Sequence, residues 1–333
     1  MKVYGSTAAQ ITVSVMVIAY KMEKTILAAV DGALAQTVPC EIIISDDASP
    51  SPDRSIELVM QHLEGYEGPH RVIVRRSEVN AGLCEHINTL VPISTGDVIV
   101  FMSGDDVAYP NRVERSLAAL DQHRDSVLVG SHVDEIDADG NSGIQYTRGM
   151  GYDSADQHRL LHCGSFICLL GASMALRRSL LADLPPLKGM VEDNMISLRG
   201  TLFGPIYCMP ETWLSYRRHG DNLSDWVFSK DGDRVKAKRQ RYERTIRMYR
   251  EIADDHERCI NALPHLSDAV RRNAQSLVAM YRIEADGREA VLLKPKREWI
   301  KPIMLGLQHP GLRRKAFERA LKIFLPRRWA GIS

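Results

Sequence analysis

Two pairs of adjacent aspartates follow short apolar runs of the chain, and they are the residues best suited to chemistry. Asp46-Asp47 comes after Glu41–Ser45, and Asp105-Asp106 comes shortly after Val98–Met102. Adjacent carboxylates can hold Mg²⁺ or Mn²⁺, which prefer oxygen ligands and bind substrate phosphates. Such an ion would neutralise charge on a departing diphosphate. This interpretation applies to Asp105-Asp106, for which the alternative is a solvated turn. Asp46-Asp47 could accept hydrogen bonds from a nucleotide base or ribose.

A third acidic pair, Glu192-Asp193, precedes a helical stretch of the sequence, Asn194–Phe203. An acid here could act as a general base that takes the proton from an attacking hydroxyl group. The helix macrodipole alone also favours acids at a helix N-terminus, so both interpretations stay open. His219 lies in a polar stretch beside Arg217 and Arg218. It is either a solvated loop residue or a further ligand for a metal ion or a phosphate.

Strands and helices alternate along the part of the sequence that carries the two aspartate pairs. Apolar strands are expected at Ile11–Ala19, Glu41–Ser45, Arg71–Val74 and Val98–Met102. A helix with one apolar face follows each strand, the first of them over Lys21–Gln36. This alternation predicts an α/β fold with a mostly parallel sheet and helices on both of its faces. Ligands of such sheets bind at the carboxyl ends of the strands, where both aspartate pairs fall.

The pattern of the 333-residue chain becomes helical beyond about residue 225. Candidate helices there are Arg234–His256, Ser267–Asp286 and Gly311–Phe324. We therefore expect a catalytic domain over residues 9–225 and a helical C-terminal extension over residues 226–333.

The C-terminal extension ends in a basic, amphipathic stretch. Between Val291 and Ser333, eleven Lys or Arg residues stand against two acidic ones. From Gly311 onward one helical face collects the apolar residues Leu312, Ala316, Phe317, Ala320, Leu321 and Phe324. Such a helix suits contact with an anionic membrane surface over residues 311–328. Packing of the same face on the catalytic domain is the alternative, and the sequence leaves both open.

Several classes of function are disfavoured. No P-loop or G-x-G-x-x-G motif follows the first strand, which argues against nucleoside triphosphate hydrolysis and dinucleotide binding. The basic residues lack interleaved aromatic residues, so we expect no nucleic-acid partner. The six cysteines form no C-x-x-C pair and indicate reduced thiols. The first ten residues lack the pattern of a signal peptide and no apolar stretch could span a bilayer. We therefore expect a cytoplasmic protein, at the inner face of the membrane if the tail binds lipid.

Taken in order along the chain, these motifs resemble glycosyltransferase family 2, the inverting enzymes with a GT-A fold. The match runs over about residues 11–225 and depends on the order and spacing of its motifs. They are Val13–Tyr20, Gln36-Thr37, Ile44–Ser49, Asn80–Leu83, Asn88, Gly96–Phe101, Ser103–Asp106, Pro110–Arg112, Gly171–Met174, Glu192-Asp193 and Tyr216–Ser224. The resemblance implies a Rossmann-like GT-A domain. It also implies transfer of a sugar from a nucleotide-sugar donor, a UDP-sugar foremost, to a glycan or lipid-linked acceptor.

The resemblance further implies roles for the acidic pairs and their neighbours. The residues that it assigns to the nucleotide-sugar are Ile18, Tyr20, Asp46, Asp47, Asn80, Gly82 and Asp105. Asp106, with Asp105 and with His219 from a closing loop, would hold Mn²⁺ or Mg²⁺ on the donor diphosphate. Asp193 would be the catalytic base, and Glu192 would support it.

Three positions depart from the family pattern. Ser103 stands where an acid is frequent, Lys21 replaces an Asn that commonly follows the first strand, and His86 stands where a small residue is frequent. The sequence as a whole predicts a metal-dependent inverting glycosyltransferase of bacterial surface polysaccharide or glycolipid assembly. The alternative is a non-catalytic nucleotide-sugar- or glycan-binding module of the same fold, which would tolerate loss of Asp193.

Overall fold

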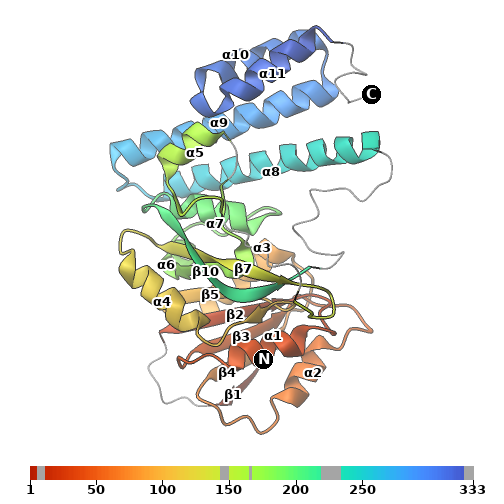
Figure 1. Ribbon diagram of the computed structural model, residues 1–333, viewed down its shortest axis with the longest axis vertical. Coiled ribbons are helices and arrows are strands. Elements are labelled where there is room, and N and C mark those ends of the chain that lie inside the picture. The colour runs from red at the N-terminus through yellow and green to blue at the C-terminus, as the bar shows by residue number, and fades with distance from the viewer. Residues whose placement is uncertain (6–11, 143–149, 165–166, 219–233, 326–333) are drawn as a thin grey trace. The chain divides into compact units, whose positions relative to one another are not determined.

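The computed structural model of the chain describes residues 1–5, 12–142, 150–164, 167–218 and 234–325. Contacts between residues divide the chain into two compact units (Figure 1). Unit 1 comprises Met1–Ser154 and Cys168–His219, and unit 2 comprises Ala155–Ile167 and Gly220–Ser333. The domain boundary inferred from the sequence, between residues 225 and 226, remains a proposal.

Unit 1 is built around a mixed sheet with the strand order β1-β4-β3-β2-β5-β9-β7-β10-β6. The strands are β1 (Lys2–Gly5), β2 (Val13–Ala19), β3 (Glu41–Asp46), β4 (Arg71–Arg76), β5 (Val98–Ser103), β6 (Val107–Ala108), β7 (Leu128–Ile136), β8 (Ser154–Ala155), β9 (Ala175–Arg177) and β10 (Ile206–Arg217). The long pairings are parallel: β2 with β3 and β5, β3 with β4, and β7 with β10. β1, β6 and β9 pair antiparallel with their neighbours. The predicted α/β fold with a mostly parallel sheet is confirmed.

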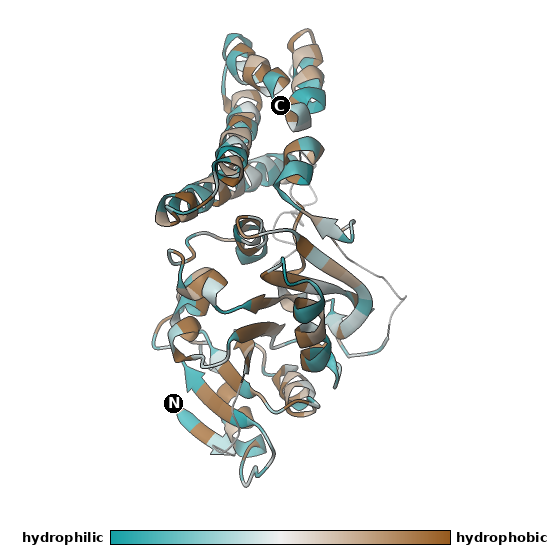
Figure 2. Ribbon diagram, turned by 90° about the vertical axis from the view of Figure 1, so that its left-hand side faces the viewer, coloured by the Kyte–Doolittle hydropathy of each residue, from teal (hydrophilic) through white to brown (hydrophobic). Residues whose placement is uncertain are grey.

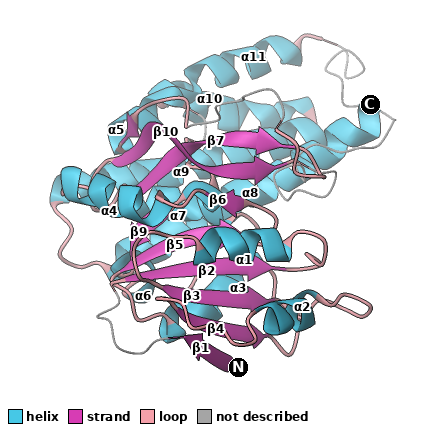
Figure 3. Cartoon of the chain, turned by 60° about the horizontal axis from the view of Figure 1, so that its bottom comes forward, coloured by secondary structure: helices cyan, strands magenta, loops and turns pink. Residues whose placement is uncertain are grey.

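Helices cover both faces of this sheet (Figure 3). Alternate residues of the central strands, such as Val15 and Ile42, join one apolar core with α1 (Ile26–Leu34), α2 (Ser55–His62) and α4 (Arg112–Gln122). The intervening strand residues Met16, Ile43 and Ile99 are also fully buried, as expected for parallel strands covered on both sides. The remaining helical segments of unit 1 are α3 (Leu83–Leu90), η1 (Val91–Ile93), η2 (Gly171–Ser173), α6 (Ser179–Ala182) and α7 (Glu192–Gly200).

The first helix begins later than predicted, because the backbone of Lys21 cannot be part of it. Lys21 has a φ of 57°, in the left-handed region that a right-handed helix excludes. The predicted range began at residue 21, whereas α1 starts at Ile26 after a turn in which the Ile26 N–H donates to Met22 O over 2.9 Å. The residues between β2 and α1 thus form a loop at the carboxyl end of the strand.

Unit 2 is helical. It contains α5 (Gln157–Cys163), α8 (Arg234–Ala262), α9 (Asp268–Leu293), η4 (Lys296–Trp299), α10 (Ile300–Gln308), η5 (Pro310–Leu312) and α11 (Arg313–Ile323). The fully buried carboxylate of Glu284 joins α9, which carries it, to α11. It accepts from Arg288 on the same helix over 2.8 Å and from Arg319 on α11 over 2.9 Å, and Lys315 Nζ lies 3.5 Å away. Lys315 also donates to Gly164 O, next to α5.

The single apolar face predicted for the tail is wrong in detail. Leu312 and Ala316 are buried, at 1% and 0% exposure, whereas Phe317 and Phe324 are 61% and 86% exposed. Ala316 packs closely on α10, since a Cβ atom placed on Gly306 of that helix would lie 3.1 Å from Ala316 Cβ. The sequence pattern had not predicted α10. Part of the predicted face therefore packs within unit 2 and part is exposed. Within the described residues, no helix has an apolar stretch of the length needed to cross a membrane.

Candidate functional site

The ends of β2, β3 and β5 form the carboxyl edge of the sheet, and the predicted acids extend from it. Ile18 lies opposite Ser103 in the ladder of β2 and β5, and Ala19 lies opposite Asp46 in the ladder of β2 and β3. The Asp47 N–H donates to Ala19 O over 2.9 Å. Strands β3 and β4 lie on one side of β2 and β5 lies on the other, so this edge is where the strand order reverses. Open α/β sheets bind ligands at such a point.

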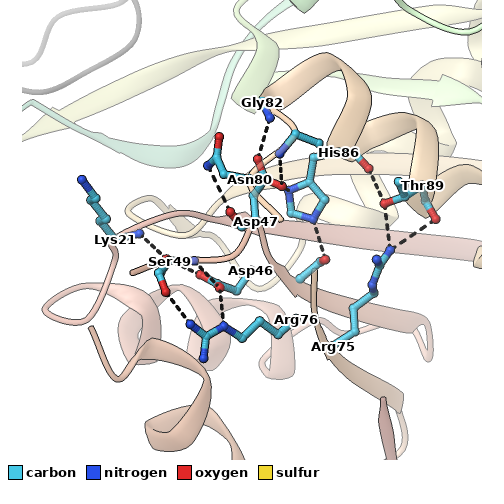
Figure 4. Close-up of polar contacts among 12 residues, drawn as sticks. Lys21, Asp46, Asp47, Ser49, Arg75, Arg76, Asn80, Gly82, His86 and Thr89 are labelled. Carbon is cyan, nitrogen blue, oxygen red and sulfur yellow. Dashed lines mark hydrogen bonds and ion pairs between the residues drawn. The ribbon is translucent and has the colours of Figure 1, made fainter. Parts of the chain in front are cut away.

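Asp47 holds the loop that follows β4 (Figure 4). Its carboxylate accepts hydrogen bonds from the backbone N–H groups of Ala81, over 3.0 Å, and Gly82, over 2.8 Å. The Asn80 side chain donates to Asp47 O over 3.0 Å. Three residues predicted to bind the nucleotide-sugar, Asp47, Asn80 and Gly82, are therefore brought together. In this arrangement the Asp47 carboxylate shapes the loop through backbone hydrogen bonds, which orients Asn80 and Gly82.

Asp46 has different partners on the neighbouring side of the edge. Its carboxylate accepts from the Ser49 N–H over 2.8 Å and from the Ser49 hydroxyl, and Arg76 Nε lies 3.5 Å from Oδ1. Ser49 in turn accepts from the Lys21 N–H over 2.7 Å. Asp46 therefore fixes the turn after β3 against the loop after β2 (Figure 4). The side chain is only 1% exposed, so its part in the site is to hold these two loops together.

His86 lies beneath Asp47 and was singled out from the sequence only as a departure from the family pattern. Its ring Nε2 is 2.6 Å from the Ser45 hydroxyl oxygen, and its Nδ1 is 3.8 Å from Asp47 Oδ1. Burial lowers the pKa of His86; Asp47 and Asp46 oppose this effect and Arg75 adds to it. The ring is therefore neutral at pH 7, and it fills the space behind the carboxylate that shapes the loop. A small residue here would leave that space unfilled.

Two apolar side chains predicted to contact the base stand at the same edge. Ile18 is half-buried near the end of β2, and Tyr20 follows the strand with 38% of its surface exposed. The Lys21 ammonium lies 5.1 Å from the centre of the Tyr20 ring. An exposed aromatic ring next to buried carboxylates offers a planar apolar surface on which a nucleotide base could stack.

Asp105 and Asp106 follow β5 and are both buried, at 5% and 0% exposure. Asp106 Oδ1 accepts from the Arg217 N–H over 2.9 Å, whereas Oδ2 is buried without a hydrogen-bond partner in the described structure. Burial and the nearby Asp105 raise the pKa of Asp106 well above its usual range, although the Arg217 N–H and the Arg112 and Arg217 guanidinium groups oppose the shift. Arg217 donates from Nε to Asp105 O over 2.8 Å, so its side chain supports the loop from inside.

The two acids fit a divalent ion that completes its coordination with substrate and water. No cluster of three or more His, Cys, Asp or Glu residues suited to a metal exists within the described part of the chain. Mg²⁺ and related ions commonly use one or two carboxylates together with substrate phosphates, and the unpartnered Asp106 Oδ2 is an oxygen of that kind. His219, the third predicted ligand, lies outside the described residues.

Glu192 and Asp193 lie in the first turn of α7, whereas the predicted helix began just after them at Asn194, and both are half-buried. Burial, and next the charge of Asp193, raise the pKa of Glu192 to about 8. Asp193 Oδ1 accepts from the backbone and side-chain nitrogens of Asn194 over 2.6 and 2.9 Å. Glu192 is thus protonated at neutral pH. A neutral acid beside Asp193 leaves that residue as the candidate base of the pair.

A chain of contacts connects this turn with the carboxyl edge. The ideal Cβ position of Gly171 lies 2.6 Å from Glu192 Oε1, so Glu192 packs closely against η2. Arg112 donates to Ala172 O over 2.6 Å and also to Phe101 O on β5. Because β9 runs antiparallel to β5 directly after η2, η2 lies toward the carboxyl end of β5. The buried Arg112 therefore joins β5 to the segment that contacts Glu192.

The family model described as Glycosyl transferase family 2 matches residues 14–184, just over half of the chain. The chain belongs to this family. Two similar proteins are EpsE of Bacillus subtilis (strain 168), at 30% identity, and the uncharacterized glycosyltransferase alr2836 of Nostoc sp. (strain PCC 7120), at 28% identity. The alignments cover 40% and 63% of this chain, and 47% and 66% of those proteins. The chain thus spans about half to two thirds of these relatives.

Two solved structures share the fold. The Staphylococcus aureus protein TarS 1–349 in complex with UDP-GlcNAc has a TM-score of 0.59 and 18% identity, with 96% of this chain and 92% of that chain covered. The mannosyltransferase PcManGT of Pyrobaculum calidifontis, in complex with GDP-Man and Mn²⁺, has a TM-score of 0.52 and 13% identity, with coverages of 97% and 84%. At these identities the likeness establishes the GT-A fold and nothing further.

Proposed function

We propose that the chain is an inverting glycosyltransferase that moves a sugar from a nucleotide-diphosphate sugar to an acceptor hydroxyl group. The observation that carries this proposal is the position of Asp46-Asp47 and Asp105-Asp106 at the carboxyl ends of β3 and β5, the two strands that flank β2 where the strand order reverses. Membership of glycosyl transferase family 2 supports the reaction class. The neighbours solved with UDP-GlcNAc and with GDP-Man support a nucleotide-sugar donor, and we favour a UDP-sugar.

In this proposal the donor base rests against Ile18 and Tyr20. The loop of Asn80 and Gly82, shaped by Asp47, borders the nucleotide. Asp105 and Asp106 would hold Mn²⁺ or Mg²⁺, which when bound supplies positive charge to the leaving diphosphate. The carboxylates themselves gain from the cation, because an unpaired buried charge is costly.

The transfer itself is a single displacement. Asp193 takes the proton from the acceptor hydroxyl, whose oxygen forms a bond to the anomeric carbon on the face opposite the leaving group. The bond from that carbon to the diphosphate oxygen breaks, and the electron pair leaves with the nucleoside diphosphate. Glu192, neutral at pH 7 because burial raises its pKa to about 8, keeps a second negative charge away from the attacking oxygen. The sugar is delivered with inversion of configuration.

We further propose that the acceptor is a glycan or a lipid-linked saccharide of bacterial surface polysaccharide or glycolipid assembly. The proposal places the protein in the cytoplasm, at the inner face of the membrane. The basic character of the C-terminal helices supports it, because anionic lipids attract Lys and Arg near a membrane surface. A divalent cation held at the carboxyl edge of the sheet would bind the phosphate groups of a nucleotide-sugar donor.

A panel of nucleotide-sugars with Mn²⁺ or Mg²⁺ tests this function, with donor hydrolysis and thermal shift as the readouts. We expect one donor to be hydrolysed in a cation-dependent manner and to raise the melting temperature. Asp193→Asn should lower turnover by about 10²–10⁴-fold while donor binding remains, because a positioned base contributes that much. Asp183→Asn, an exposed acid at the end of α6, is the matched control and should keep full activity. Full turnover in Asp193→Asn would show that the base is another residue.

A further inference from the structure

The exposed apolar side chains of the described structure concentrate in one short region. Fifteen large hydrophobic residues are exposed, and eight of them fall between Leu293 and Leu325. This region contains α10 and α11, which are short and pack on each other and on α9. Figure 2 shows hydrophobic and hydrophilic residues alternating along the helices of this part of the chain. Exposed apolar residues gathered in this way mark an interaction surface more often than chance.

On each helix the exposed apolar residues form a stripe. Ile300, Met304 and Leu307 follow one another at intervals of four and three on α10, with exposures of 56%, 56% and 39%. Phe317 and Leu321 on α11 and Phe324 at its C-cap repeat the same intervals, with exposures of 61%, 53% and 86%. Residues at these intervals share one face of a helix. Trp299, Ile303 and Ala316, which directly precede stripe residues, join the apolar core of unit 2, so each helix has a buried side next to its exposed stripe.

The contacts of α11 show where its stripe points. Lys315 and Arg319 face Glu284 on α9, and Ala316 faces Gly306 on α10. Each residue turns about 100° around the helix axis. The stripe of Phe317 and its partners therefore lies beyond the contact with α10, on the side directed away from α9. It adjoins the outer side of α10, which carries the other stripe. We call these two stripes together the outer apolar surface.

Positive charge surrounds the outer apolar surface. Between Lys294 and Leu325 there are nine Lys or Arg residues and only two acids, Glu298 and Glu318. Lys315 and Arg319 are used internally by Glu284, but Arg297, Lys301, Arg313 and Arg314 are exposed. A second copy of the chain would bring the same positive charge to the contact, which opposes self-association through this surface. An anionic bilayer offers both an apolar interior and negative headgroups.

We propose that the outer apolar surface of α10 and α11 binds the headgroup region of an anionic lipid bilayer without crossing it. The stripes enter the boundary between headgroups and acyl chains, and the exposed Lys and Arg residues pair with lipid phosphates. This surface differs from the continuous face expected over residues 311–328, since it adds α10 and loses Leu312 and Ala316. The proposal extends the proposed function by assigning a membrane-binding surface, and it needs no sugar donor for its test.

Co-sedimentation of the full chain with phosphatidylcholine vesicles, with and without phosphatidylglycerol, tests the proposal. We expect binding only to the vesicles that contain phosphatidylglycerol, and we expect salt to weaken it. The double variant Phe317→Ser with Leu321→Ser should bind at least about tenfold more weakly. Each substitution removes an apolar side chain whose transfer from water into the bilayer would favour binding. The pair Lys301→Gln with Arg314→Gln should lose about fivefold for each charge removed. Phe203→Ser, which changes an exposed aromatic residue of unit 1 with 43% exposure, is the matched control and should bind normally.

Thermal unfolding and donor hydrolysis without lipid are measured on the same variants and should be unchanged. This separates failure of the membrane surface from failure of the proposed glycosyl transfer. Equal binding to both vesicle types, or normal binding by the Phe317 and Leu321 variant, would overturn the proposal. So would a dimer of the wild-type chain in lipid-free buffer that the same variant abolishes, because a second copy would then be the partner.

Discussion

The imidazole of His86 lies behind Asp47, with Nδ1 3.8 Å from Oδ1 of the carboxylate that anchors the Ala81-Gly82 loop. The ring is buried and its other nitrogen is bonded to Ser45. One neutral histidine therefore lies against the carboxylate that orders the loop proposed to border the donor site. Because the two groups are so close, the charge on the histidine and the position of the loop are coupled.

Acidification should destabilise the fold through His86. Burial lowers its pKa in the folded chain below the ordinary 6.5, so the unfolded chain binds the proton more readily. The neutral His86 ring therefore makes its full contribution to the free energy of unfolding above pH 6.5. This contribution decreases as the pH falls from 6.5 toward the folded-state pKa. Urea unfolding over a pH series should show a smaller acid-dependent loss for His86→Asn than for the wild type. His123→Asn, a half-buried histidine stacked on Tyr207, should keep the wild-type slope. An unchanged slope in His86→Asn would contradict the prediction.

Removing the Asp47 carboxylate should loosen the loop of Asn80 and Gly82. Two charge-assisted hydrogen bonds to backbone N–H groups are lost in Asp47→Ala, which should lower the free energy of unfolding by about 1.5–3 kcal/mol. Asp47→Asn keeps one acceptor and should lose less. Both variants should raise the KM for the donor more than they lower kcat, as steady-state kinetics would show. Asp139→Asn, an exposed acid in a turn, should behave as wild type in both measurements. A wild-type KM in Asp47→Ala would argue against the loop as part of the donor site.

Replacing Glu192 by Gln should stabilise the chain at neutral and higher pH. The folded-state pKa of Glu192 is about 8, against 4.5 for the free side chain, so the folded chain holds a proton that the unfolded chain releases. This contribution to stability is present below pH 4.5 and is lost as the pH rises through about 8. Chemical unfolding should find Glu192→Gln more stable than the wild type, with a difference that grows across that interval. Glu64→Gln, an exposed acid after α2, should show no such trend. If the stability difference between Glu192→Gln and the wild type decreased with rising pH, the raised pKa of Glu192 would be refuted.

Lys21 adopts a backbone conformation that asparagine accepts more readily. Its φ of 57° is in the left-handed region, where a residue with a long side chain costs about 1 kcal/mol and Asn is enriched. This conformation gives a physical reason for the Asn that commonly occupies the position in the family. Lys21→Asn should therefore raise the free energy of unfolding by up to about 1 kcal/mol. Lys24→Asn, an exposed lysine in the following turn, should bring no gain. Equal destabilisation by both substitutions would show that the backbone conformation carries no strain.

The sequence predicted the parallel strands and the position of the acids, because both depend on local patterns. The apolar runs of four to nine residues were recognisable as strands, and a residue that directly follows a parallel strand lies at the carboxyl edge of the sheet. A helix next to Glu192 and Asp193 was also anticipated, since acids favour the first turn of a helix, but α7 begins at Glu192, two residues before the predicted start.

The partners of those acids could not be predicted, because they come from distant parts of the chain. Asp47 and the loop that it anchors are separated by more than thirty residues, and Asp106 and Arg217 by 111. A lysine gives no indication in the sequence that its backbone is left-handed, so the start of α1 was predicted too early, at Lys21. In the tail, helical periodicity shows which apolar residues share a face but not which of them contact another helix. Contact with α10 buries Ala316, whereas Phe317 and Phe324 of the same predicted face are exposed.

The buried Glu284 has a consequence for any shortened form of the protein. Two of its three cationic partners, Lys315 and Arg319, belong to α11. A chain that stopped before Arg313 would leave the Glu284 carboxylate with Arg288 alone and would remove Ala316 from the apolar core of unit 2, so this unit should be less stable. The last helix is thus a structural requirement of the helical unit, so truncated proteins should be insoluble or unfolded there, and point substitutions are the proper tool for dissecting its surface.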